Sequence, residues 1–152
     1  MTTVTLPTVP PPRRLTVAPG RSLAELTAWY GPFPVRRRRV PLAAAALERP
    51  ADTGHPTYRF EFDDRELRAV LTSERVEDLP GDRFQLTADL TLGETAFPVL
   101  LRMRVVDRAE DRLLVVGTAR LPYRLLRRAT GFRLPRRLPA TRLRLLVAAE
   151  FA

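Results

Sequence analysis

An uninterrupted alternation of apolar and polar residues runs from Phe84 to Leu92. The apolar positions are Phe84, Leu86, Ala88, Leu90 and Leu92, and the polar positions between them are Gln85, Thr87, Asp89 and Thr91. Successive side chains of a β-strand point to opposite faces of the sheet, whereas a helix repeats every 3.6 residues. The segment therefore predicts a strand with one buried and one solvated face, in a sheet whose apolar side must be covered.

Comparable segments recur along the chain. Tyr58–Phe62, Val99–Val106 and Arg142–Phe151 alternate in the same way, and Leu113–Leu121 is apolar on both faces. The turn signals between the later segments are Pro80-Gly81-Asp82, Gly93-Glu94 and the polar run 107–111. Consecutive strands joined by short turns predict antiparallel hairpins. We expect an all-β fold, a closed antiparallel up-and-down barrel of about eight strands with at most a short helix, because closure removes the sheet edges. The local pattern leaves a two-sheet sandwich open.

The first half of the chain is more ambiguous. Leu15–Val17 predicts a short strand that ends at the turn dipeptide Pro19-Gly20. Ser22–Trp29 fits either a strand or a short helix, since its serine and glutamate have the spacing of a helical capping box. Val35–Leu47 leaves a strand and a helical turn open, because its alanine-rich end fits both.

Length and composition indicate one domain. The 152 residues suffice for a single core, which we place at residues 13–152, and the proline-rich leader at 1–12 is expected to be disordered. We find no signal-peptide pattern and no apolar run long enough for a transmembrane helix. The chain has no cysteine, which excludes disulfides and thiolate metal sites. We expect a cytoplasmic protein and leave a homodimer open.

The net charge of +9 raises the question of nucleic-acid binding. All 26 basic residues are arginine, and lysine is absent. Selection for phosphate contacts would favour both cations, so the lysine void indicates a coding bias that acts on a solvated surface. Nucleic acid is therefore not the expected partner. A small basic barrel that binds an acidic partner or nucleic acid through an arginine-rich outer face remains the alternative function.

Several motifs that resemble a known family lie in the second half, most clearly over residues 70–151. Leu71–Leu92 is similar to the middle of the YceI-like family, where a hairpin leads into a G-D-L-T strand, and Gly93–Val99 (GETAFPV) is similar to that family's G-x-T-x-P-V segment. Val116–Arg120, Thr130-Gly-Phe132 and the closing strand Leu143–Phe151 resemble its later part. The resemblance implies an eight-stranded, lipocalin-like barrel that holds an isoprenoid or other lipid by apolar contact. It also implies a carrier rather than an enzyme.

The inward faces of the predicted strands supply the candidate ligand site. Its expected interior residues are Phe60, Phe62, Leu86, Leu90, Leu101, Met103, Val115, Leu145 and Val147. Barrels of this size either enclose one small ligand or fill their interior with side chains, and the sequence leaves both outcomes open.

The run of arginines from Arg36 to Arg39 predicts the position of the barrel mouth. In a strand two of the four would point inward, which an apolar interior tolerates only where the long side chains reach the rim. We therefore place Arg36 and Arg38 at the rim, as partners for a ligand headgroup, together with Trp29. Ordinary solvation of the arginines and ordinary packing of the tryptophan are the alternatives.

No residue pattern indicates catalysis. His55 is the only histidine, so neither a metal site nor a histidine-based dyad can be assembled from the usual ligands, and no cofactor is expected. Asp63, Asp64 and Glu66 have neither EF-hand nor glycosidase spacing, and we expect them to form a solvated turn.

Overall fold

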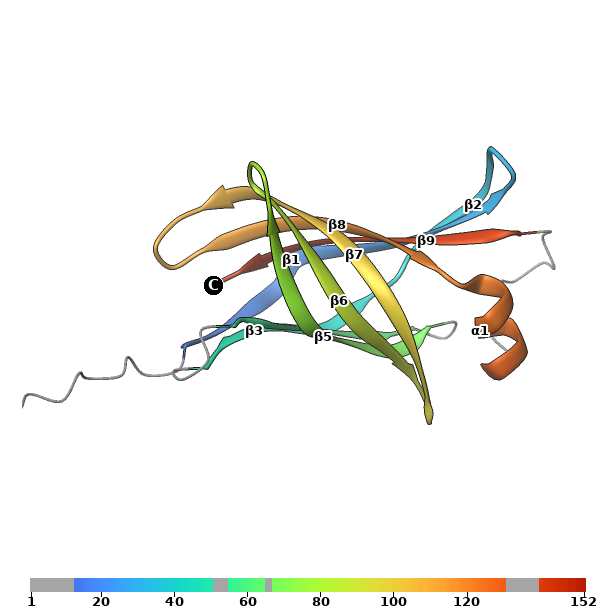
Figure 1. The fold of residues 1–152 in the computed structure, drawn as a ribbon, viewed down its shortest axis with the longest axis horizontal. Coiled ribbons are helices and arrows are strands. Elements are labelled where there is room, and N and C mark those ends of the chain that lie inside the picture. Colours follow the sequence, from blue (N-terminus) through green and yellow to red (C-terminus); the bar gives the residue numbers. More distant parts are fainter. Residues whose placement is uncertain (1–12, 51–54, 65–66, 131–139) are drawn as a thin grey trace, which may run out of the picture.

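The computed structural model describes residues 13–50, 55–64, 67–130 and 140–152. The leader predicted at 1–12 lies outside these residues. The described elements are nine strands and one helix (Figure 1): β1 (Arg13–Tyr30), β2 (Phe33–Arg39), β3 (Leu42–Arg49), β4 (Thr57–Asp63), β5 (Arg68–Leu79), β6 (Arg83–Leu92), β7 (Thr95–Arg108), β8 (Leu113–Leu121), α1 (Tyr123–Thr130) and β9 (Arg142–Phe151).

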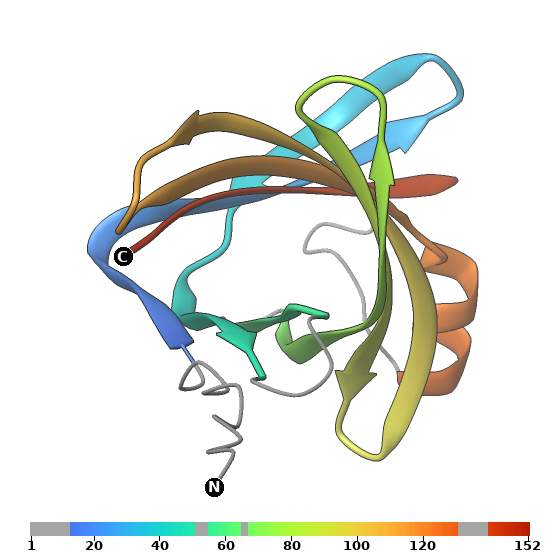
Figure 2. The same ribbon diagram turned by 60° about the vertical axis from the view of Figure 1, so that its left-hand side comes forward.

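The strands form one antiparallel sheet that closes on itself. Its order is β2-β1-β3-β4-β5-β6-β7-β8-β9, and an additional pairing of β1 with β9 closes the ring (Figure 2). β2 and β3 are successive partners of β1, β3 along Arg13–Thr16 and β2 along Glu25–Tyr30, so together they fill one position of an eight-stranded barrel. The predicted all-β, lipocalin-like barrel with one short helix is confirmed, and the sandwich is not formed.

The hairpins of the second half follow the predicted turns. β5 and β6 are joined through Gly81, with φ at 77°, and β6 and β7 are joined through Gly93, with φ at 58°. Positive φ costs glycine little because it lacks a Cβ, so these glycines allow the strand reversals that fix the register on either side.

β1 decides one alternative that the sequence left open and corrects one expectation. Ser22–Trp29 is a strand, and its pairing along β9 and β2 supplies the hydrogen bonds that a capped helix would have made internally. Pro19-Gly20 does not end the strand. The register against β9 shifts between Val17 and Ser22, so the dipeptide lies in an irregular stretch of the pairing. The pairing with β9 resumes at Ser22, so one long strand continues around the barrel.

The stretch 35–47 is also extended, with a break at Val40-Pro41 between β2 and β3. The backbone N–H of Val40 still donates to the carbonyl of Ala24 at 2.9 Å, so the break stays attached to β1. Beyond it, Ala45, Ala46 and Leu47 are buried in β3, and the helical turn is not formed.

Candidate ligand-binding site

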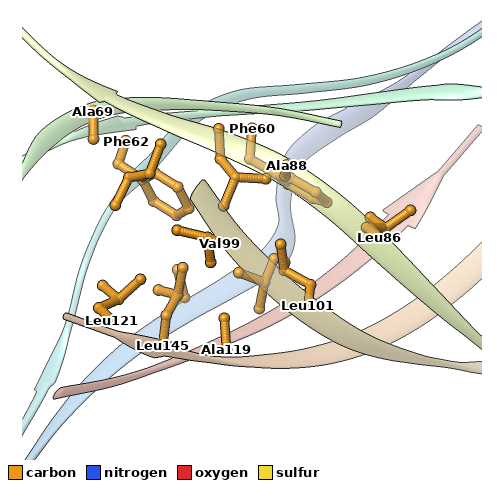
Figure 3. Close-up of a cluster of buried hydrophobic side chains, with 14 of the residues drawn as sticks. Phe60, Phe62, Ala69, Leu86, Ala88, Val99, Leu101, Ala119, Leu121 and Leu145 are labelled. Atoms are coloured by element: carbon orange, nitrogen blue, oxygen red, sulfur yellow. The ribbon is translucent and has the colours of Figure 1, made fainter. Parts of the chain in front are cut away.

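All nine residues predicted for the interior are buried. Phe60, Leu86, Leu90, Leu101, Val115, Leu145 and Val147 have no exposed surface, Met103 is 2% exposed and Phe62 is 3% exposed. They come from β4, β6, β7, β8 and β9, and Figure 3 shows side chains of these strands converging on a common interior.

An aromatic cluster occupies part of the interior. The Tyr58 ring stacks on Phe84 at a centroid distance of 5.5 Å and meets Phe151 edge-on at 5.9 Å. Phe60 contacts Phe151 edge-on at 6.0 Å. Burial raises the pKa of Tyr58 to about 12, against the opposing effect of Arg49 and Arg108. The hydroxyl therefore stays neutral, which suits an apolar surrounding.

Small residues alternate with these large ones along the interior face. The buried alanines of the wall are Ala24, Ala28, Ala45, Ala69, Ala88, Ala119 and Ala149. Gly117 of β8 lies opposite Met103 of β7, and a Cβ at this glycine would overlap the Met103 Sδ. The Met103 thioether thus lies directly over the Gly117 backbone, and the two neighbouring strands are in close contact at this point of the interior face.

Arg36 and Arg38 lie on the inner face of β2. Their partners across the β1–β2 pair are Ala28 and Leu26, both buried on the inward side of β1. Both arginines are half-buried, whereas Arg37 and Arg39 on the other face are exposed. The structure therefore brings these two predicted rim residues to the inner face of the strand that extends beyond the barrel at one end (Figure 1).

An ion pair crosses this end of the barrel and corrects one expectation. Arg38 Nη2 lies 2.9 Å from the carboxylate of Asp64, in the connection between β4 and β5. The Asp64 side chain is only 9% exposed, so it does not belong to a solvated turn as we expected. A carboxylate can be buried here because a guanidinium meets it. Asp63 keeps the expected exposure, and Glu66 lies outside the described residues.

Trp29, the third predicted rim residue, lies on the opposite face of β1. It pairs with Pro34 of β2 and Arg142 of β9, and the Arg142 guanidinium lies 5.8 Å from its ring centroid. Trp29 therefore lines the outer wall and is separated from Arg36 and Arg38 by the sheet itself.

A cavity of about 600 Å³ lies beside Trp29, against the outer wall formed by β7, β8 and β9. Four arginines that the sequence analysis did not single out line it: Arg102, Arg120, Arg142 and Arg144. Their alternation with apolar residues shows that they face outward. It does not show that their three strands are neighbours, so no local signal could have grouped them.

Some of the other charges on the outer wall are paired locally. Ion pairs join Arg14 to Glu48, Arg21 to Glu150, Arg37 to Glu25, Arg59 to Glu61, Arg68 to Asp63 and Arg112 to Asp107. These pairs place carboxylates among the arginines of the basic surface.

Within the described ranges, the residues that a metal site would need do not lie together. His55 is exposed in the connection before β4, and no group of three or more histidine or acidic residues is placed to hold a metal ion in the described parts. The one described helix is too short to cross a membrane.

No protein-family model matches the chain, and no curated protein matches its sequence. The structure is similar to the crystal structure of BcnA from Burkholderia cenocepacia, with a TM-score of 0.57. The two sequences are 10% identical, and the match covers 88% of this chain and 98% of BcnA. At this identity the likeness shows the fold alone, and that fold is consistent with the YceI-like barrel that the sequence motifs predict.

Proposed function

We propose that this chain is a non-enzymatic binding protein that holds an apolar ligand, an isoprenoid or another lipid, inside its barrel. The observation that carries the proposal is the chemistry of the inner face. Among the described strands, the buried part of that face is lined by aliphatic and aromatic side chains, with Ser73 as its buried polar residue. The Ser73 hydroxyl accepts a hydrogen bond from the Tyr58 backbone N–H at 2.8 Å.

Three further features support this function. A closed barrel of eight strands can hold one small ligand, as in lipocalins, where side chains do not fill the interior. The alanines of the wall reduce the side-chain volume that projects inward. Arg36 and Arg38 lie on the inner face at one end, where a polar headgroup would remain when its chain enters the barrel, and Arg38 is held there by Asp64. The cytoplasmic location stays a prediction, and a homodimer stays an open alternative.

The arginine-rich outer face supports the alternative function less well. Its arginines are spread around the barrel, and several of them are held by neighbouring carboxylates. An acidic macromolecule would have to break these pairs to make its own.

Native mass spectrometry of the purified protein tests the proposal, with lipid identification after denaturing extraction. We expect a stoichiometric apolar lipid, and uptake of a polyprenyl lipid by the delipidated protein. A bare protein mass that stays unchanged after incubation with such lipids would contradict the proposal and favour a filled core.

A pair of alanine substitutions locates the ligand. Ala88→Leu adds volume to the inner face of β6, where Ala88 is 1% exposed, and Ala96→Leu adds the same volume to the exposed face of β7. We expect lipid occupancy to fall in Ala88→Leu and to persist in Ala96→Leu. If Ala88→Leu instead loses about 1–3 kcal/mol of stability with unchanged lipid content, it has overpacked a core that the ligand does not touch.

A further inference from the structure

The cavity on the outer wall lies where two strands of the barrel separate. Pairing between β7 and β8 begins at Leu101 and Ala119 and continues only toward the β7–β8 hairpin. On the other side of this point, Pro98 and Leu100 of β7 line the cavity, and proline has no N–H to donate to a neighbouring strand. The buried residues Val99, Ala119 and Leu143 form its apolar floor.

The walls of this cavity concentrate positive charge. Arg102, Arg120, Arg142 and Arg144 come from three adjacent strands, and Arg120 lies directly opposite Arg144 across the β8–β9 pair. Like charges placed opposite each other in a sheet are destabilising. Within the part of the chain that the structure describes, no carboxylate lies within 4.0 Å of Arg102, Arg120 or Arg144 to relieve this repulsion.

Arg142 is held in place by two contacts. Its Nη2 donates to the Gly31 carbonyl at 2.7 Å, and its guanidinium lies over the Trp29 ring. These contacts leave the remaining guanidinium N–H groups available and reduce the entropy that the side chain would lose on binding an anion. The Arg142 side chain thus forms a fixed wall on one side of the cavity, and the opposite side of the cavity is open.

We propose that this pocket binds a phosphoryl group, carried either by a free phosphate or diphosphate or by the head of a phosphorylated lipid. Guanidinium groups match phosphate oxygens in bidentate geometry. A carboxylate presents one negative charge and two oxygens, which one arginine satisfies. Four arginines around one cavity instead fit a group with two or more negative charges and three or more oxygens.

This inference stands apart from the proposed interior site, although the two are neighbours. The floor residues Val99, Ala119 and Leu143 belong to the barrel core, so a head bound in the pocket would lie beside the apolar interior. The pocket binds its anion whether or not the barrel holds a chain.

The chain carries its own probe for this site, because Trp29 is its only tryptophan and lines the cavity. Tryptophan fluorescence is titrated, at fixed ionic strength, with inorganic diphosphate, decyl phosphate and decanol. The test variant is Arg120→Gln/Arg144→Gln. The matched control is Arg83→Gln/Arg104→Gln, which removes two arginines that also lie opposite each other, on β6 and β7, but outside the cavity.

We expect saturable binding of inorganic diphosphate and decyl phosphate, weakened about tenfold or more in the test variant and unchanged in the control. Saturation by decyl phosphate alone, with the same variant pattern, assigns the pocket to a lipid head. The proposal is overturned if no phosphate titrant saturates, if decanol binds as well as decyl phosphate, or if both variants weaken binding equally. Lipid that still copurifies with the test variant shows that the interior site works independently of the pocket, and a bare wild-type protein that still binds diphosphate shows that the interior site fails while the pocket stands.

Discussion

Gly117 is the position where one methyl group tests the packing of the barrel interior most directly. A Cβ added to this residue would overlap the Met103 Sδ and lie 2.8 Å from its Cε, while the Arg102 carbonyl stays at 3.5 Å. The φ of Gly117 is not among the positive values that disfavour a side chain. The expected cost of Gly117→Ala therefore comes from displacing Met103 and not from backbone strain.

Two opposing contributions set the size of this effect. Overpacking a close-packed core costs about 1–3 kcal/mol, and replacing glycine by alanine at a compatible backbone recovers about 0.4–1 kcal/mol by restricting the unfolded chain. We expect Gly117→Ala to lower the free energy of unfolding by about 1–2 kcal/mol. For a chain of this length that corresponds to a Tm lower by about 2–8 °C.

A double-mutant cycle isolates the contact. Met103→Ala alone should lower the free energy of unfolding by about 2–5 kcal/mol, because removing this side chain, which is 2% exposed, leaves a cavity. In that background Gly117→Ala should become neutral or stabilising by about 0.5 kcal/mol, giving a coupling of at least about 1 kcal/mol between the two sites. Urea unfolding followed by circular dichroism measures all four proteins. An unchanged or higher Tm for Gly117→Ala, or strict additivity, would refute the reasoning.

Two more predictions concern ionisable groups at the interior and the mouth. The pKa of Tyr58 is raised to about 12 from an ordinary value of 10.0, so between these values the folded chain keeps a proton that the unfolded chain releases. The stability that the neutral Tyr58 contributes is therefore complete below about pH 10 and is lost between about pH 10 and 12. In urea unfolding at pH 9 and pH 11, wild type should lose more stability than Tyr58→Phe, by about 1–1.5 kcal/mol, and equal losses would contradict the assignment. Arg38→Gln should cost about 1–3 kcal/mol at pH 7, because it removes the guanidinium from the carboxylate of Asp64, whose side chain is 9% exposed, whereas Arg39→Gln on the exposed face should stay within about 0.5 kcal/mol. Equal values for the two variants would show that the ion pair adds nothing to stability.

The strands that sequence reasoning predicted well are those whose signal is local. In β6 each polar residue lies between two apolar ones and a glycine turn lies at each end, so period, face and limits all follow from neighbouring residues. The faces of the arginines at 36–39 could be predicted in the same way, because a strand through these residues has two side chains on each face. Such inferences need no knowledge of which strands become neighbours.

The features that the sequence left open or missed depend on pairing between distant segments. Ser22–Trp29 fits both a strand and a capped helix, and the pairing with β9 and β2 along its two edges decides for the strand. Asp64 appears in the sequence as one acid among several in a turn, and only the approach of Arg38 from β2 explains its burial. The arginine-lined cavity likewise requires β7, β8 and β9 to be adjacent, which the alternation within each strand does not specify.

The outer pocket has to be compared with the distribution of arginine over the rest of the barrel. A chain whose basic residues are all arginine will place many of them at outward positions of its strands, so the presence of arginine there explains little. Arg83 and Arg104 are opposed across β6 and β7 in the same way as Arg120 and Arg144 across β8 and β9. What differs is the wall beneath them, because β6 and β7 stay paired from Leu92 and Thr95 to Arg83 and Arg104 whereas β7 and β8 separate beside the second pair. If the two pairs behave alike toward phosphate, composition alone accounts for the basic surface. If only the second pair binds, the separation of the strands has turned an arginine bias into a site.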